Sequence, residues 1–331
     1  MFTSTLFASI LPEMLILLVG MLLLIVEPFW KEEQRRNAGW LTAGGLFVSM
    51  LLSLFFGQPG EPTATLGGMV RFDWLGFFFK MLFMFAGAAT ALLMMDSDRL
   101  GQRGESYLLL LASLLGMNLM AASSDLIMLF LALETTSIPL YVLAGFFLGD
   151  EKSTEAGFKY LLFGILTTTF MLYGFSLVFG FAGTTDLYQL ADMFQDGSLS
   201  LISAFGLLAL ILVGIGFKVS IVPFHFWAPD VYEGAPTPIA GFLSTASKAA
   251  GFAVLVRLFF VSFPNFAESW TIALAILSAV TMTVGNLLTL PQTNIKRLLA
   301  YSSVAHAGYA MIGVVAFNQL GAASVVFYLA A

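Results

Sequence analysis

Four ionisable side chains lie inside long apolar runs of this 331-residue chain, where a membrane-spanning segment rarely carries a charge. Glu134, Lys218 and Lys248 lie deep within their runs, and Lys159 lies nearer to one end. A charge at the centre of a bilayer costs at least about 2.5–3.5 kcal/mol on insertion scales, so a residue kept there usually has a function or a partner. The pattern predicts a line of groups that exchange protons within a membrane.

The apolar runs are too long and too continuous for the core of a water-soluble protein. Only 10% of the residues are charged and 59% are hydrophobic, and about 20 mainly apolar residues are enough to cross a bilayer as a helix. We therefore expect an all-α, polytopic bundle of transmembrane helices. The ten predicted spans are residues 12–29, 38–56, 74–95, 107–122, 126–148, 156–183, 201–227, 236–263, 270–290 and 297–317, and an eleventh begins near Gly321.

The organisation of the chain suggests one membrane domain. No linker or low-complexity stretch divides residues 1–331, and the eleventh apolar run stops at Ala331, so we expect a fragment of a longer chain. Pro12 suits the first turn of a helix, where its missing N–H costs nothing. No basic segment or small-residue cleavage site precedes it, which favours an uncleaved membrane helix over a signal peptide.

The positions of Lys and Arg predict that the N-terminus lies outside the membrane, because loops on the inner side carry an excess of these residues. In that orientation Arg71 is the only basic residue in an outer loop, and the predicted outer loop 184–200 carries three Asp and no basic residue. The inner loops would hold Lys31, Arg35, Arg36, Arg99, Arg103, Lys152, Lys296 and Arg297.

Several classes of site are excluded by composition. The chain has no Cys, which rules out disulfides and thiolate-held iron–sulfur clusters on it. The two His residues, His225 and His306, lack metal-ligand spacing, and no metal, cofactor-binding or nucleic-acid motif is found. Electrons of any coupled redox reaction must therefore travel on other chains.

The depth of the charged residues can be estimated from the predicted spans. Glu134 lies three residues from the middle of its span, or about 4–5 Å at 1.5 Å per residue. Lys218 and Lys248 are similarly deep, His306 is at mid-span, and Lys159 is near enough to an end to snorkel. These groups could be structural ion pairs. However, two deep lysines against one glutamate leave one positive charge without a counter-charge. A buried lysine of that kind is ready to release its proton.

The span that carries Lys218 is expected to be broken. Gly214 and Gly216 precede the lysine, and Pro223 follows it. Proline removes a backbone donor and clashes with the preceding turn, and transporters use discontinuous helices of this kind at ion sites. An ordinary kink is the alternative. Pro139 predicts a kink in the helix of Glu134 as well.

Three motifs identify a family. Residues 223–238 read PFHFWAPDVYEGAPTP, residues 244–248 read STASK, and residues 292–303 read QTNIKRLLAYSS. This chain resembles the antiporter-like membrane subunits of respiratory complex I, the proton-translocating NADH:quinone oxidoreductase. The large subunits of multisubunit Na⁺/H⁺ antiporters share the pattern. The forms DVYEGAP and SK are those of the N-type subunits.

The resemblance implies a role for each candidate residue. Glu134 resembles the fifth-helix glutamate that is paired with the lysine of the broken seventh helix, here Lys218. Lys248 resembles the eighth-helix lysine that relays the proton onward, and Lys159 resembles a sixth-helix lysine. His225 and His306 lie in family motifs, as relay or water-ordering groups. The family's fold is an inverted repeat, whose second broken helix is expected beyond Ala331.

The resemblance also implies the setting in which the chain works. It implies a proton-translocating subunit in the bacterial plasma membrane, moving protons through a Glu/Lys/Lys relay coupled to quinone reduction elsewhere in the complex. NADH, flavin, iron–sulfur clusters and quinone are expected on other subunits, with subunits M, K, A and J and the lipid bilayer as partners and no nucleic acid.

Three other functions were compared with this one. The chain could belong to a Na⁺/H⁺ antiporter, which neighbouring genes would distinguish. It could be a quinone-binding catalytic subunit, but its polar groups are strung along several helices rather than gathered around one headgroup. A structural scaffold would leave the mid-depth charges unexplained.

Overall fold

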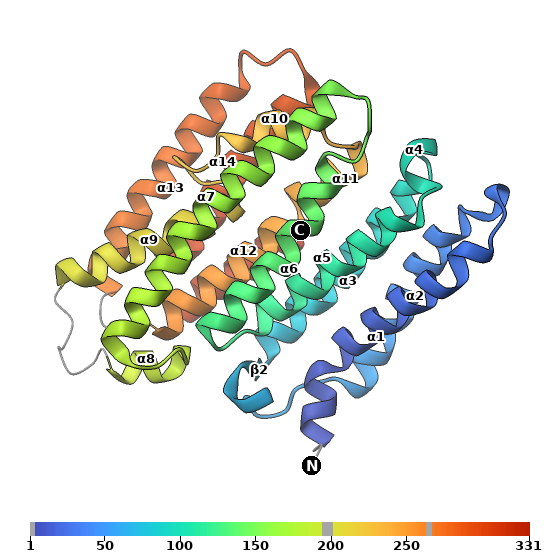
Figure 1. Ribbon diagram of the computed structural model, residues 1–331. Coiled ribbons are helices and arrows are strands. Elements are labelled where there is room, and N and C mark those ends of the chain that lie inside the picture. The colour runs from blue at the N-terminus through green and yellow to red at the C-terminus, as the bar shows by residue number, and fades with distance from the viewer. Residues whose placement is uncertain (1–3, 194–200, 263–266) are drawn as a thin grey trace. The chain divides into compact units, whose positions relative to one another are not determined.

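Helices form most of the described chain, as the sequence predicts (Figure 1). The computed structural model describes residues 4–193, 201–262 and 267–331. Within those residues, ten helices are long and apolar enough to cross a membrane. The predicted all-α membrane bundle is therefore confirmed.

The chain divides into two compact units. Unit 1 consists of Met1–Phe158 and Gly234–Ala246, and unit 2 consists of Lys159–Glu233 and Ser247–Ala331. The prediction of one integral-membrane domain stays a prediction.

Unit 1 is a bundle in which α1, α2, α3 and α5 lie side by side, α5 packs on α6, and α11 packs on α3 and α6 (Figure 1). Its elements are α1 (Ser4–Val26), the 3-10 turns Glu27–Phe29 and Glu32–Gln34, α2 (Asn37–Phe56), β1 (Thr63–Thr65), the 3-10 turn Leu66–Gly68, β2 (Val70–Phe72), α3 (Trp74–Met94), α4 (Asp98–Gly101), α5 (Gly104–Ala122), α6 (Leu126–Ala144), the start of α7 (Glu151–Ala182) and α11 (Thr237–Ser244).

The first helix begins eight residues earlier than predicted, at Ser4, so Pro12 lies inside α1 and is buried. The prediction that Pro12 occupies the first turn is wrong. The preceding residues are small or apolar and continue the helix, and membrane helices tolerate an internal proline because neighbouring groups satisfy the freed backbone. Glu13 consequently lies inside the helix, where it is buried.

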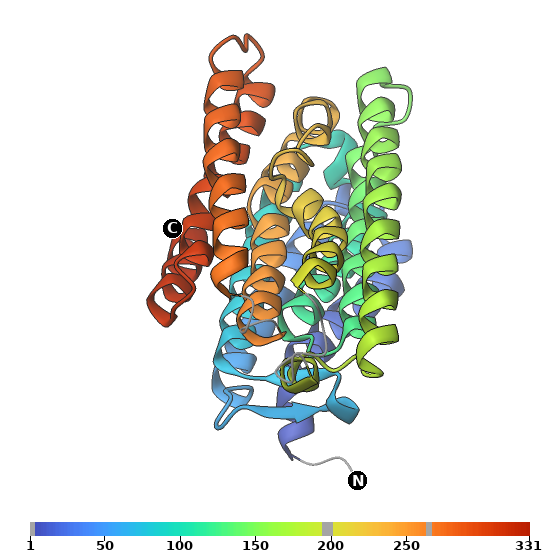
Figure 2. The same ribbon diagram turned by 90° about the vertical axis from the view of Figure 1, so that its left-hand side faces the viewer.

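A small β-hairpin between α2 and α3 was not predicted. Strands β1 and β2 pair antiparallel, with Thr63 opposite Phe72, and they lie at the end of unit 1 where α1 begins (Figure 2). Gly67 in the turn has φ of +69°, a conformation that glycine adopts without steric cost. Alternating small and polar residues in segments this short give little strand signal.

The hairpin is joined to the turn between α5 and α6. Val70 forms a β-bridge with Ser123. The Ser124 amide donates to the Met69 carbonyl at 3.0 Å, and its hydroxyl donates to the Gly68 carbonyl at 2.6 Å. The start of α6, the helix of Glu134, is therefore held by backbone contacts to the hairpin.

Unit 2 contains the longer part of α7 and the helices that follow it except α11, with α13 packed on α14 and α14 on α15 (Figure 2). Its other elements are α8 (Leu187–Met193), α9 (Leu201–Val219), α10 (Trp227–Gly234), α12 (Ala246–Arg257, from Ser247 on), the π-helical turn Leu258–Ser262, α13 (Ala267–Thr289), α14 (Ile295–Val315) and α15 (Gln319–Ala330). Helix α8 lies in a segment predicted as an outer loop.

Two predicted helices are interrupted. The span predicted over residues 201–227 ends at Val219, and the chain resumes as α10 only at Trp227. The span predicted over 236–263 is divided at Thr245, whose φ of −112° and ψ of −85° end α11 before α12 begins. The second break was missed because Thr245 and its neighbours carry no proline or glycine signal.

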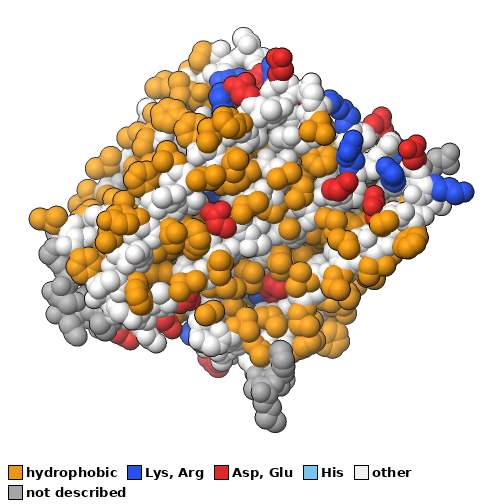
Figure 3. Space-filling model, in the orientation of Figure 1, with side chains coloured by type: hydrophobic (Ala, Val, Ile, Leu, Met, Phe, Trp, Pro, Cys, Tyr) orange, Lys and Arg blue, Asp and Glu red, His pale blue; other side chains and the backbone are white. Residues whose placement is uncertain are grey.

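The outward faces of the helices carry the side chains that a bilayer requires. Figure 3 shows hydrophobic side chains spread over the helices, whereas charged side chains gather in two places, around α4 and at the top of the view. At α4, Arg36 and Asp98 form an exposed ion pair with 2.6 Å between Nη2 and Oδ1. The chain is therefore an integral, multi-pass membrane protein.

Candidate functional site

The helix of Lys218 breaks directly after this residue. Lys218 lies in the last turn of α9, and Ser220 has φ of +60°, which carries the backbone out of the helix. The Ile221 amide still donates to the Gly216 carbonyl at 3.0 Å, and the Val222 amide donates to Thr281 Oγ1 of α13 at 3.1 Å. The discontinuous helix predicted from the Gly and Pro residues is therefore present, and the break is more than a kink.

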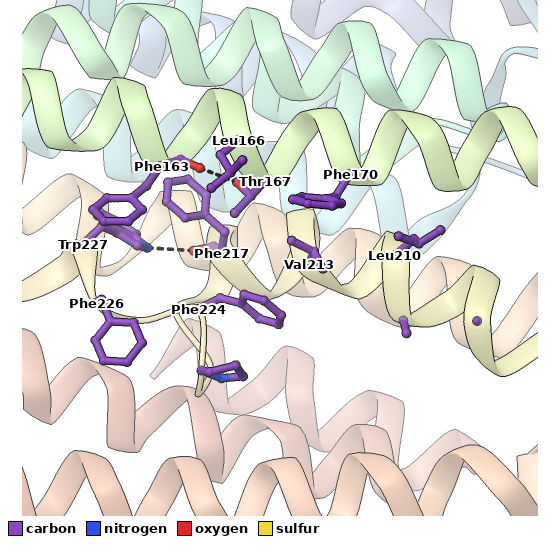
Figure 4. Close-up of a pocket in the computed structure, with 13 residues that line it drawn as sticks. Phe163, Leu166, Thr167, Phe170, Leu210, Val213, Phe217, Phe224, Phe226 and Trp227 are labelled. Carbon is purple, nitrogen blue, oxygen red and sulfur yellow. Dashed lines mark hydrogen bonds between the residues drawn. The ribbon is translucent and has the colours of Figure 1, made fainter.

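Trp227 closes the break from the other side. Its indole Nε1 donates at 3.1 Å to the Phe217 carbonyl in the last turn of α9, which also accepts from the Ser220 amide at 3.1 Å. The indole also stacks on Tyr160 of α7, with ring centroids 4.4 Å apart and an interplanar angle of 11°. Figure 4 shows the Trp227 bond beside the labelled aromatic residues. One side chain thus fixes α10 to both α9 and α7.

The side chain of Lys218 is buried, and its stem lies against the backbone of α12. A Cβ atom on Gly251 would lie 3.2 Å from Lys218 Cγ and 2.5 Å from Val219 Cγ1. Only a glycine permits this approach, because real Cβ atoms do not come so close to their neighbours. Gly251 therefore sets the distance between Lys218 and the helix that carries Lys248.

Lys248 lies one turn before Gly251 on α12 and is also buried. Its Nζ donates to two oxygens of Ser303 on α14, the carbonyl and the hydroxyl, each at 2.8 Å. The hydroxyl of Ser303 itself donates to the Ala300 carbonyl at 2.8 Å. Its oxygen therefore accepts from Lys248.

An apolar cavity of about 450 Å³ lies beside the break (Figure 4). Residues of α7, α9 and the segment after α9 line it, among them Phe163, Phe170, Phe217 and Phe224. The hydroxyl of Thr167 in this lining donates to carbonyls of its own helix. The cavity therefore suits hydrocarbon rather than a chain of waters leading from Lys218.

Glu134 belongs to unit 1, where it lies near the middle of α6 and is partly buried. Its Oε1 is buried without a hydrogen-bond partner among the described residues. Helix α6 continues through Pro139, and the hydroxyl of Thr136 donates to the Ala132 carbonyl at 2.9 Å. Because Lys218 and Lys248 belong to unit 2, the predicted pairing of Glu134 with Lys218 stays a prediction.

Lys159 takes part in an ion-pair cluster. Its Nζ lies 2.5 Å from Asp230 Oδ2, and Arg297 Nη1 of α14 lies 2.6 Å from the other Asp230 oxygen and 3.1 Å from Glu233 Oε2. Burial raises the pKa of Asp230, but the hydrogen bonds and positive charges of Lys159 and Arg297 outweigh it and hold that pKa below its ordinary value. The cluster joins α7, α10 and α14.

The two histidines occupy different environments. His225 lies within the break, is buried, and has an Nδ1 without a hydrogen-bond partner in the described part of the chain. His306 is exposed on α14, and its Nδ1 lies 2.5 Å from the hydroxyl of Tyr328 on α15. His225 is thus placed inside the break that follows Lys218, whereas His306 faces α15.

Several residues of the site were not singled out from the sequence. Asp230, Glu233, Arg297 and Ser303 all lie within motifs that identified the family, yet no role was assigned to them. The ion-pair cluster could have been predicted by pairing Asp230 and Glu233 with nearby basic residues such as Lys159 and Arg297. No feature of the sequence identifies Ser303 as the partner of Lys248. In the described residues, no three His, Cys, Asp or Glu side chains are grouped as a metal site.

Comparison with known proteins places this geometry in a family. The model described as "NADH:quinone oxidoreductase/Mrp antiporter, TM" matches residues 123–331. The chain is 43% identical to "NADH-quinone oxidoreductase subunit N" of Moorella thermoacetica over 318 residues, covering 96% of this chain and 66% of the relative. A relative of the same name from Trichlorobacter lovleyi is 42% identical over 327 residues, covering 97% and 66%. The chain thus spans slightly less than two thirds of these relatives.

Solved structures agree with this assignment. A chain of "Respiratory complex I from Thermus thermophilus with bound Aureothin" matches with a TM-score of 0.79 and 35% identity, covering 96% of this chain and 67% of that one. A chain of the Mrp complex from Dietzia sp. shares the fold, with a TM-score of 0.80 at 23% identity, covering 96% and 36%. The buried lysine at a helix break, the three motifs and these similarities agree, and the chain belongs to the transmembrane family of NADH:quinone oxidoreductase and Mrp antiporter subunits.

Proposed function

We propose that this chain is a proton-translocating membrane subunit of an NADH:quinone oxidoreductase. The observation that carries the proposal is the break in α9 directly after the buried Lys218. A broken helix at membrane depth exposes backbone groups that only an ion, water or protein partner can satisfy. The name of the relatives and the solved complex I chain support the assignment.

The relay would run from Lys218 to Lys248, with Glu134 modulating the first step. An ammonium has three hydrogens to donate, and Ser303 accepts two of those of Lys248. The third is the proton that Lys248 would pass on, while Ser303 holds the nitrogen in place. Gly251 keeps the stem of Lys218 against the same helix, and His225 within the break could order water. Lys159 and His306 would have secondary roles.

The setting of this subunit is part of the proposal. The chain has no Cys, so thiolate-held iron–sulfur clusters would lie on other subunits, together with flavin, the NADH site and the quinone site. Subunits M, K, A and J are the expected membrane partners. We place the chain in the bacterial plasma membrane with its N-terminus outside, because eight basic residues then lie in inner loops.

The test uses the assembled complex in proteoliposomes. Glu134→Gln and Lys218→Met should lower the number of protons pumped per quinone reduced, with unchanged subunit content. Lys31→Met and Glu32→Gln are matched controls, because both residues are exposed in a loop, and they should pump normally. Normal pumping by both Glu134→Gln and Lys218→Met would contradict the proposal.

A Na⁺/H⁺ antiporter subunit is the second candidate. The family model includes Mrp antiporters, and the Mrp chain of known structure shares the fold. Identification of the subunits that co-purify with the native chain separates the two functions. An antiporter assembly would also acidify or alkalinise vesicles in response to a Na⁺ gradient without NADH, whereas the quinone-linked complex would require electron transfer.

A further inference from the structure

A second pair of opposite charges is buried in unit 1, away from the proposed relay. Glu13 of α1 and Lys80 of α3 lie with Oε1 and Nζ 2.8 Å apart, and their side chains are only 7% and 5% exposed. Lys80 Nζ also donates to the Ser9 carbonyl at 2.9 Å. Charged side chains are almost never buried this fully unless they are paired.

The carboxylate of Glu13 has few hydrogen-bond donors around it. Neither oxygen of Glu13 has a hydrogen-bond partner of suitable geometry among the described residues, although Oε1 is within ion-pair distance of Lys80. A buried ion pair stabilises a protein only when further hydrogen bonds satisfy its remaining lone pairs. Oε2 of Glu13, which is not the oxygen that faces Lys80, is therefore available to accept a proton.

A small cavity lies between Lys80 and residues of strand β2. Its volume of about 10 Å³ is the size that holds one water. Ser9, Arg71, Asp73 and Lys80 are among the residues that line it, and Arg71 and Asp73 are partly exposed. One water here would connect Lys80 to groups that reach solvent.

A buried amide lies at the same level on α5. The Ser9 hydroxyl at the start of α1 lies 3.1 Å from that of Thr65 in the hairpin, and α5 ends at the same hairpin, so α1 and α5 run antiparallel. A Cβ on Gly20 would lie 3.8 Å from Leu111 Cδ1. Glu13 is seven residues before Gly20, and Asn118 is seven after Leu111, so the two lie at one depth.

Asn118 is fully buried, and neither its Oδ1 nor its Nδ2 has a hydrogen-bond partner among the described residues. A buried amide without partners is costly, which water or a transient proton carrier at this level would relieve. Asn118 thus supplies a second buried polar group at the depth of Glu13.

Few other charges surround the pair. Helices α2 and α11 and strand β1 carry no charged residue, and α3 carries only Lys80. The single charge on α5 is Glu105 in its first turn, at the end away from the hairpin. Arg71 and Asp73 line the cavity, and Glu61 and Asp125 lie in the segments next to the hairpin and to Ser124.

We propose that Glu13 and Lys80 form a second proton-exchange site, which opens to the hairpin end of unit 1 through the cavity beside Lys80. A proton binds to a carboxylate oxygen of Glu13 and gives a neutral acid beside the ammonium. Lys80 then releases one of its protons to a water in the cavity and becomes a neutral amine. Transfer of the acid proton from Glu13 to that amine restores the ion pair, so one proton enters and one leaves.

The first test does not depend on turnover. Infrared difference spectra between acidic and alkaline buffer are recorded on the full chain in lipid nanodiscs. We expect a carboxylic acid C=O band in the wild type that is lost in Glu13→Gln and shifted in Lys80→Met. Glu32→Gln, an exposed carboxylate, should keep the band. Identical spectra for wild type and Glu13→Gln would overturn the proposal.

The second test compares single and double variants in the assembled complex. If the pair only holds α1 to α3, Glu13→Gln/Lys80→Met should recover toward the wild type, because it leaves no unpaired buried charge. If the pair exchanges protons, the double variant should lose pumping as fully as either single variant. Recovery of pumping in the double variant would overturn the proposal.

Lys80→Arg keeps the positive charge, so it is the variant to test if Glu13→Gln or Lys80→Met prevents assembly of the complex. An arginine stays protonated at all working pH values, so loss of pumping in an assembled Lys80→Arg complex supports exchange, and normal pumping contradicts it. The spectra decide the proposal even if Glu134 and Lys218 prove dispensable. The Glu13–Lys80 site is separate from the proposed relay of Lys218 and Lys248. Only the pumping measurements rest on the proposed proton-translocating function.

Discussion

Lys218 and Gly251 are in close contact: the Cγ of the lysine lies 3.2 Å from where a Cβ on Gly251 would be. The two residues belong to α9 and α12, and each helix is interrupted near its buried lysine. Because Lys248 lies one turn before Gly251, a change at position 251 would move the stem of one lysine relative to the helix of the other. The distance between the two proposed relay groups is therefore set by a residue without a side chain.

Gly251→Ala should lower proton pumping without abolishing assembly. The added methyl would lie 2.5 Å from Val219 Cγ1, so α9 must shift, and overpacking of this kind costs about 1–3 kcal/mol. The comparison is pumping per quinone reduced in proteoliposomes with equal subunit content. Gly206→Ala on α9 is the matched control, because its Cβ meets no atom within 4 Å. Equal effects of the two substitutions would contradict a special role for position 251.

Lys248→Arg should be nearly as defective as Lys248→Ala in proton-coupled quinone reduction. Arginine keeps the charge and can still donate to the Ser303 oxygens, but its pKa near or above about 12 prevents release of the proton. Quinone reductase activity and pumping are measured in membranes with equal subunit content. Near-normal activity of the arginine variant would make Lys248 a structural cation that anchors α12 to α14.

Trp227→Phe should destabilise the folded chain by about 0.5–1.5 kcal/mol, the net value of one hydrogen bond. Phenylalanine keeps an aromatic ring beside Tyr160 but cannot donate to the Phe217 carbonyl. Thermal unfolding of the full chain in nanodiscs measures the change. Trp74→Phe serves as control, because Trp74 is largely exposed. An equally large effect of Trp74→Phe would show that the hydrogen bond of Trp227 to Phe217 contributes nothing specific.

Asp230→Asn should lower stability at neutral pH but not in strong acid. Asp230 has a depressed pKa in the folded chain, so its ion pairs contribute fully above the unfolded value, about 3.9, and are lost as the pH falls through the folded value. Unfolding midpoints of the two proteins are compared across that range. A difference that is constant with pH would show that the carboxylate charge is not what stabilises the cluster.

The hydrophobic pattern was enough to predict the membrane helices. Long apolar runs specify spans with few alternatives, and most predicted boundaries lie within a few residues of the observed ones. The break after Lys218 could be predicted as well, because Gly216 and Pro223 act locally on the backbone. Glu134, Lys218 and Lys248 were found because a charge in an apolar run is conspicuous.

The sequence could not predict features that depend on tertiary contact. Pro12 was placed in a first turn because of its local preference, and the pairing of the neighbouring Glu13 with Lys80 of another helix has no local signal. Ser303 accepts from Lys248 across a separation of 55 residues. The division at Thr245 has no local signal. For Glu13 and Lys248 the determining partner is distant along the chain.

The contacts that join the hairpin to Ser123 and Ser124 have a practical consequence for labelling this protein. A reporter peptide inserted at Gly67 would separate the strands and free the first turn of the helix that carries Glu134. An insertion at Gly60, which is exposed and meets no neighbour within 4 Å, would leave those bonds intact. Gly60 is therefore the position for an epitope tag or fluorophore that reports which side of the membrane this loop faces.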